Sequence, residues 1–106
     1  MKMYTTPAQT AKLIELGFEK PRCATMFWRD NKEVTEINYT IGELLSFLPK
    51  EIDYNGFKST LYIFVNQGAW EVEYADFLGE LYLTYRSELI DAIFDICVKL
   101  KEEGVI

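Results

Sequence analysis

Residues 60–74 constrain the fold more than any other part of the chain, because they have the pattern of two strands joined by a tight turn. Residues 60–65 (Thr-Leu-Tyr-Ile-Phe-Val) are rich in β-forming residues, and residues 66–68 (Asn-Gln-Gly) favour a turn. Residues 69–74 then alternate between large apolar and acidic side chains. The residues predicted to face inward are Trp70, Val72 and Tyr74, and those predicted to face water are Glu71 and Glu73. This hairpin requires an antiparallel sheet with one wet face.

A second hairpin is predicted nearer the N-terminus. Residues 22–29 are rich in β-formers, Asp30-Asn31-Lys32 is a plausible turn, and residues 33–39 form the returning strand. Residues 77–86 fit two interpretations, an extension of the sheet or an aromatic-rich connector.

Two helices are indicated by capping boxes, in which a threonine and a residue three positions later bond to each other's backbone N–H groups. The first helix covers residues 7–16, with Gln9 closing the box and Gly17 ending the helix. The second runs from residue 41 to 47 or 48, with Glu43 closing its box and Pro49 preventing continuation.

A third helix is predicted from the cap Ser87 to about Glu103, ended by Gly104. Its apolar stripe consists of Leu89, Ile90, Ile93, Phe94, Cys97 and Leu100, and its acidic side carries Glu88, Asp91, Asp95 and Glu102. This separation is typical of a helix that packs on a core through one face.

The expected fold is therefore a single α+β domain over residues 1–106. Its predicted order is helix, hairpin, helix, hairpin, helix, with an antiparallel sheet of about four strands packed against the helices. No apolar run is long enough for a membrane span, and the first residues lack the pattern of a signal peptide, so a cytoplasmic location is expected.

Charge and residue types exclude several functions at this stage. The net charge of −6 removes the electrostatic attraction on which most nucleic-acid binding depends, so direct DNA or RNA binding is not expected. The chain has no histidine, the commonest general base and transition-metal ligand. Cys23 and Cys97 are far apart in the sequence and are expected to be reduced thiols rather than a disulfide framework.

No catalytic, cofactor-binding or metal-binding residues are predicted. The carboxylates of Glu71 and Glu73 could form an acid–base pair only in a dry cleft, and a solvated strand face is the simpler interpretation. The turn at residues 53–56 (Asp-Tyr-Asn-Gly) offers too few oxygen ligands for Ca²⁺. Cys97 belongs to the apolar stripe of the last helix, where a buried thiol is inert.

Aromatic residues are the one excess in this composition. Tyr62 and Phe64 share one side of the strand at residues 60–65, and Tyr82 and Tyr85 lie in the ambiguous segment. If these four residues are exposed, they are candidate partner-binding residues, because interfaces are enriched in aromatic anchors. The alternative is that a helix covers them.

Three segments together resemble small uncharacterised proteins of bacteriophages and prophages, especially those of gut bacteria. They are residues 6–9 (Thr-Pro-Ala-Gln) leading to 16–21 (Leu-Gly-Phe-Glu-Lys-Pro), residues 39–49, and residues 87–94 leading to 99–104. The resemblance implies an origin and a fold. Since the family has no established activity, it transfers no functional residue.

Three functions follow as hypotheses. The first is a non-catalytic phage or prophage accessory factor that acts by binding an unidentified protein partner. The second is an acidic inhibitor that mimics nucleic acid and occupies the basic groove of a host defence enzyme, using the acidic side of the last helix. The third is a small-ligand binder or an enzyme without a recognisable motif.

Overall fold

The computed structural model describes residues 1–22 and 24–106, so Cys23 lies outside the described residues. In this part of the chain the helices and strands are, in order, α1 (Pro7–Glu15), β1 (Ala24–Arg29), β2 (Lys32–Ile37), α2 (Ile41–Ser46), β3 (Glu51–Tyr54), β4 (Phe57–Asn66), β5 (Ala69–Asp76), β6 (Gly79–Arg86) and α3 (Leu89–Glu102). The molecule is elongated, with principal extents of 55 × 32 × 17 Å. The fold is α+β with antiparallel sheets, as the sequence predicts.

The strand arrangement corrects the predicted order of alternating helices and hairpins. Strands β3 to β6 form one four-stranded antiparallel sheet in the order β3-β4-β5-β6, and β1 and β2 form a separate two-stranded sheet. The turn predicted over residues 53–56 is shorter in the structure, because Asp53 and Tyr54 belong to β3. Asn55 and Gly56 both adopt positive φ, which makes a two-residue turn that pairs Glu51–Tyr54 with β4. Of the two interpretations of residues 77–86, the sheet extension is correct, since β6 pairs with β5.

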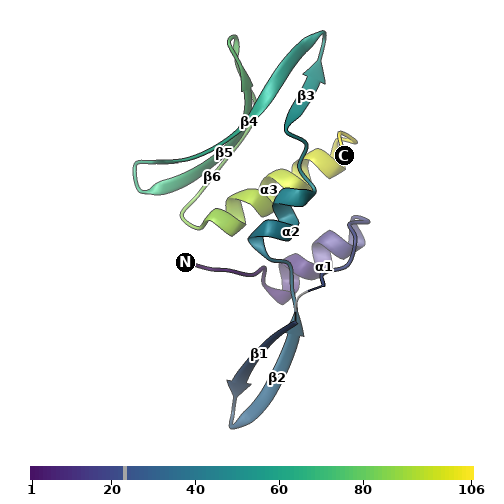
Figure 1. The fold of residues 1–106 in the computed structure, drawn as a ribbon, viewed down its shortest axis with the longest axis vertical. Helices are drawn as coiled ribbons and strands as arrows, with labels where there is room; N and C mark the ends of the chain where they lie inside the picture. The colour runs from purple at the N-terminus through teal and green to yellow at the C-terminus, as the bar shows by residue number, and fades with distance from the viewer. Residues whose placement is uncertain (23) are drawn as a thin grey trace.

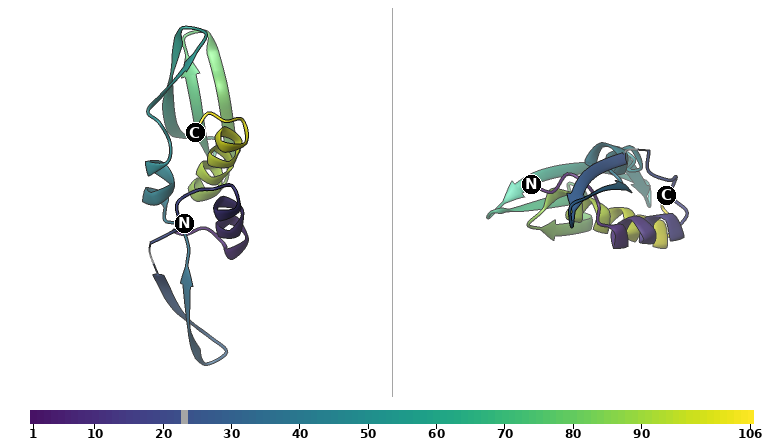
Figure 2. Two further views of the ribbon diagram at one scale, coloured as in Figure 1. Left: turned by 90° about the vertical axis from the view of Figure 1, so that its right-hand side faces the viewer. Right: turned by 90° about the horizontal axis from the view of Figure 1, so that it is seen from below.

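The β1–β2 hairpin, here called the arm, does not join the larger sheet. It points away from the helices at one end of the molecule, while the four-stranded sheet lies at the other end (Figures 1 and 2). The N-terminal segment holds the chain at the base of the arm, since the Thr5 backbone N–H donates to the Tyr39 carbonyl and the Tyr39 backbone N–H donates to the Thr5 hydroxyl.

The core lies where α3 packs on β5 and β6 and where α2 packs on α3. Val72 and Tyr74 point inward from β5 and are fully buried, as the alternation of residues 69–74 predicts. The apolar stripe of α3 faces them. The fully or almost fully buried apolar residues are Leu13, Phe18, Tyr39, Leu44, Leu48, Ile52, Val72, Tyr74, Ile90, Ala92, Ile93, Ile96, Cys97 and Leu100. None of the helices in residues 1–22 and 24–106 has the length and apolar character that crossing a bilayer requires.

Both predicted capping boxes are confirmed. The Thr6 hydroxyl accepts a hydrogen bond from the Gln9 backbone N–H, and the Thr6 backbone N–H donates to the Gln9 side chain. Thr40 and Glu43 make the same reciprocal pair at α2. Such boxes depend on four consecutive residues, which is why the sequence locates these two helix starts correctly.

The predicted cap of the last helix is wrong. The residue before α3 is Glu88, not Ser87, and its side chain makes no capping hydrogen bond. Strand β6 continues to Arg86, so Ser87 and Glu88 serve as a two-residue connection between strand and helix. The Glu88 carboxylate instead accepts a hydrogen bond of 2.9 Å from the backbone N–H of Lys2.

Asp91 joins the N-terminal segment, α1, β6 and α3. Its carboxylate accepts hydrogen bonds from Lys2 Nζ at 2.9 Å and Gln9 Nε2 at 2.8 Å, and Arg86 Nη2 lies 3.9 Å away. Burial alone raises the pKa of Asp91, but the hydrogen bonds from Lys2 and Gln9 and the charges of Lys2 and Arg86 outweigh it. The pKa of Asp91 is therefore lower than its ordinary value.

This shift makes stability depend on pH in a defined direction. A carboxylate with a lowered pKa in the folded state stabilises the fold above its unfolded pKa, near 4, and loses that contribution as the pH falls through the folded value. We expect the free energy of unfolding, measured by urea titration, to decrease below about pH 4. Replacing Asp91→Asn should cost about 1 to 3 kcal/mol at pH 7 and should flatten this dependence. A variant as sensitive to acid as the wild type would contradict the assignment.

Candidate interaction surface

The four-stranded sheet has an inner face, on which α3 packs, and an opposite outer face. In antiparallel strands, residues directly opposite each other share a face. The register places Phe64 opposite Glu71 and Glu71 opposite Tyr85. It likewise places Tyr62, Glu73 and Leu83 in a second row. The outer face is defined here by these six residues.

Four large apolar side chains are exposed on the outer face. The exposed fractions are 50% for Tyr62, 39% for Phe64, 42% for Leu83 and 47% for Tyr85. The alternative in which a helix covers Tyr62 and Phe64 is therefore wrong. Three of the four predicted partner-binding residues lie together on this face, and Leu83 is a further member that the sequence analysis did not name.

Tyr82 lies on the inner face, away from the other three predicted residues. It stands opposite Tyr74 and packs against the buried core. A hydrogen bond with Glu103 is the main reason that the pKa of Tyr82 is raised, with burial and the Glu103 charge adding to the effect. Tyr82 and Tyr85 are three positions apart in one strand, and residues an odd number apart point to opposite faces.

The two carboxylates on β5 sit between the apolar side chains of the outer face and are half-buried. Burial first, and then the nearby charges of Glu80 and Glu71, raise the pKa of Glu73. Glu71 accepts a hydrogen bond of 2.8 Å from Asn66 Nδ2, and the Tyr85 hydroxyl donates to the Asn66 carbonyl at 2.9 Å. These bonds fix one end of the outer face, which is open and does not enclose the two carboxylates in a dry cleft.

The acidic side of α3 is paired within the chain. Asp91 and Asp95 both contact Arg86, the latter at 2.7 Å from Arg86 Nη1. Glu102 lies 3.6 Å from Lys12 Nζ. These ion pairs leave less negative charge available on this side of the helix than its sequence indicates.

Cys97 is buried and has the properties of an unreactive thiol. Its Sγ donates a weak hydrogen bond to the Leu44 carbonyl at 3.7 Å, and burial raises its pKa to about 12. In the described part of the chain, no three acidic or cysteine side chains come together in a group that could hold a metal ion.

The arm is a second exposed apolar surface, which the sequence analysis missed. Met26, Trp28 and Ile37 share one side of this hairpin and are 65%, 74% and 55% exposed. The spacing of Met26 and Trp28, two residues apart in a strand, was an available signal. The sequence predicts one antiparallel sheet of about four strands, whereas β1 and β2 form a separate sheet and leave this side of the arm in water.

Comparison with known proteins gives no match, whether with family models, with curated proteins or with solved structures.

The two tryptophans provide a direct test of the arm's exposure. Trp28 is largely exposed, whereas Trp70 packs against the core. A Trp70→Phe variant, which retains Trp28, should emit at a wavelength close to that of free N-acetyltryptophanamide. Acrylamide should quench the fluorescence of Trp28 in this variant at nearly the rate at which it quenches free N-acetyltryptophanamide. The Trp28→Phe variant should show blue-shifted emission and weaker quenching. Equal quenching of the two variants would mean that the arm folds against the body or that Trp70 is not packed.

Proposed function

We propose that this chain is a non-catalytic protein that binds a partner protein through the outer face of its four-stranded sheet. The observation that carries the proposal is the exposure of Tyr62, Phe64, Leu83 and Tyr85 in two adjacent cross-strand rows. Exposed apolar groups gathered on one face of a sheet mark interaction sites in proteins that otherwise bury such residues.

The composition of the outer face supports the same function. Tyrosine and phenylalanine are enriched at the centres of protein interfaces, where they bury a large area at a small cost in side-chain entropy. Glu71 and Glu73 lie between these anchors, and no ion pair to either is present among the described residues. A partner with basic side chains around an apolar centre has the complementary charge.

Strand pairing and a hydrogen bond hold the side chains of the outer face in place, which favours binding. Strand β5 is paired on both sides, by β4 and by β6, and the Tyr85 hydroxyl is held by the Asn66 carbonyl. Side chains that are already ordered lose less entropy when a partner binds, so more of the contact energy is retained as affinity.

The alternative of a nucleic-acid mimic has less support. That function needs a row of unpaired carboxylates, and the acidic side of α3 is instead paired with Arg86 and Lys12. The role of phage or prophage accessory factor stays a prediction, since no comparison bears on it.

The experiment is a quantitative affinity capture with matched variants. The Tyr62→Thr/Leu83→Thr double variant removes two exposed apolar groups from the outer face and keeps β-forming residues in the strands. The Met26→Thr/Ile37→Thr double variant removes two exposed apolar groups from the arm and serves as the control. We expect each to change the free energy of unfolding by less than about 1 kcal/mol, because surface substitutions contribute little to stability.

We expect the wild type and the arm variant to capture the same partner proteins. The outer-face variant should capture at least ten-fold less of them. Mass spectrometry with isotopic labels measures this depletion. If the outer-face variant captures the same proteins as the wild type while the arm variant loses them, the arm is the binding surface and the proposal is wrong.

A further inference from the structure

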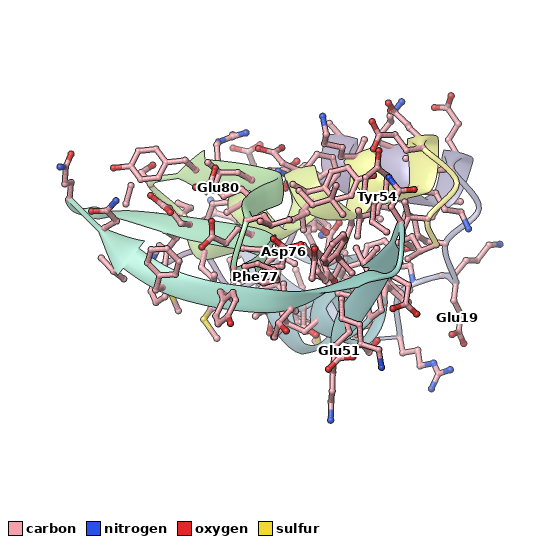
Figure 3. All side chains as sticks on the ribbon, turned by 90° about the horizontal axis from the view of Figure 1, so that it is seen from above. Glu19, Glu51, Tyr54, Asp76, Phe77 and Glu80 are labelled. Atoms are coloured by element: carbon pink, nitrogen blue, oxygen red, sulfur yellow. The ribbon has the colours of Figure 1, made fainter. Side chains whose placement is uncertain are left out.

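A cleft of about 310 Å³ lies between the tips of two hairpins, at the end of the molecule opposite the arm. One tip joins β3 to β4 and the other joins β5 to β6, and both tips lie at the same end of the sheet (Figure 1). Figure 3 views this end, with Tyr54 on one side and Asp76, Phe77 and Glu80 on the other. The volume is at the lower end of the range for ligand pockets and suits a group of the size of one amino-acid side chain.

The two tips are held together by an aromatic contact. The rings of Phe57 and Phe77 meet edge to face, with centroids 6.1 Å apart. A β-bulge between β5 and β6, at Tyr74 and Ala75, also increases the local twist, which curls the sheet around the cleft. The cleft is therefore a consequence of the strand geometry.

The walls of the cleft are mostly apolar. Tyr54 and Phe57 line it from one hairpin, and Leu78 and Leu81 line it from the other. Tyr54, Phe57 and Leu78 are 56%, 44% and 69% exposed. An apolar group of a ligand that packs against these walls would be removed from contact with water.

Ser59 is the observation that points to a ligand. It lines the cleft, is only 2% exposed, and its hydroxyl makes no hydrogen bond to any residue that the structure describes. A buried hydroxyl without a partner destabilises a fold, so such groups are rare unless something else satisfies them. A polar atom of a ligand in the cleft would supply the missing bond.

Asp76 supplies the carboxylate of the cleft, and no lysine or arginine is among the lining residues. Glu80 also lines the cleft, but it stands opposite Ala75 and its charge acts on Glu73, so its side chain belongs to the outer side of the sheet. Asp76 Oδ1 accepts a hydrogen bond from the Leu78 backbone N–H at 2.7 Å, and no ion pair to Asp76 is present within residues 1–22 and 24–106. Lys58, on the neighbouring strand pair, lies 3.8 Å from Glu51 and is engaged there.

We propose that this cleft binds an organic cation, an ammonium or guanidinium group on an apolar stem. The stem lies against Tyr54, Phe57 and Leu78, and the cation lies near the Asp76 carboxylate, the Ser59 hydroxyl and the aromatic ring faces. An anionic ligand is repelled, and a neutral ligand leaves the Asp76 carboxylate without a counter-charge. The cation can belong to a free amine or to a lysine or arginine side chain of another protein. The site does not depend on the outer face.

Two pairs of matched probes test the proposal by ¹H–¹⁵N NMR titration of the whole protein. Phenethylamine is compared with 2-phenylethanol, which has the same apolar body and no charge. N-acetylarginine amide is compared with N-acetylcitrulline amide, its neutral isostere. We expect saturable shifts confined to the amides of residues 54–59 and 76–81, with a Kd at least ten-fold lower for the cation of one pair than for its neutral counterpart.

Saturation by phenethylamine alone assigns the site to free amines, and saturation by the arginine probe assigns it to a partner's side chain. Both outcomes support the proposal. Equal binding of cationic and neutral probes, or no saturable shift in this region with either cation, overturns it.

Variants locate the contributions of the individual groups. Asp76→Asn should raise the Kd of the binding cation at least five-fold, and the control Asp53→Asn, with the same charge change on β3, should leave it within two-fold. Ser59→Ala should raise the Kd while leaving the protein at least as stable in urea, because it removes an unsatisfied hydroxyl. Equal effects of Asp76→Asn and Asp53→Asn would show that net charge, and not this cleft, attracts the cation.

Discussion

The packing of α3 on β5 is the interaction on which the rest of this structure depends. Val72 and Tyr74 on the strand and the apolar stripe of the helix bury one another completely, and α2 adds Leu44, whose carbonyl accepts a hydrogen bond from Cys97 of α3. Burial of large aliphatic and aromatic side chains contributes about 1.5 to 3 kcal/mol each. The other helices and strands are connected to this packed centre. Where strands extend beyond α3, no helix in the described part of the chain covers them, and many of their side chains are exposed to water.

The exposed surfaces follow from that arrangement. One helix covers one face of the sheet, so the side chains of the opposite face remain in water wherever the strands alternate. The arm extends beyond the core, and an isolated two-stranded hairpin has no second layer against which to bury Met26 and Trp28. These exposed aromatic and aliphatic groups are the basis on which we propose that the chain binds a partner.

Charge is distributed unevenly along the molecule. At the helical end, Lys2, Lys12 and Arg86 neutralise the carboxylates of α3 and tie the N-terminal segment to it. At the end of the sheet, Glu71, Glu73 and Glu80 have no such partners among the described residues. Most of the unpaired negative charge behind the net charge of −6 therefore lies on the sheet, beside the exposed aromatic groups. This separation supports the proposals that the outer face binds a partner with basic side chains and that the cleft between the hairpin tips binds an organic cation.

The sequence by itself determined the features that depend on a few consecutive residues. The capping boxes at Thr6 and Thr40, the turn at Gln67-Gly68 and the apolar stripe of α3 are local patterns, and the structure contains each of them. Tertiary structure decided which face each residue of β6 occupies. The bulge at Tyr74 and Ala75 inserts one residue into β6, and because strand side chains alternate with a period of two, that insertion turns Tyr82 inward and Leu83 and Tyr85 outward. The separation of the arm and the closure of the cleft by Phe57 and Phe77 likewise involve residues that are distant in sequence, so no local pattern could reveal them.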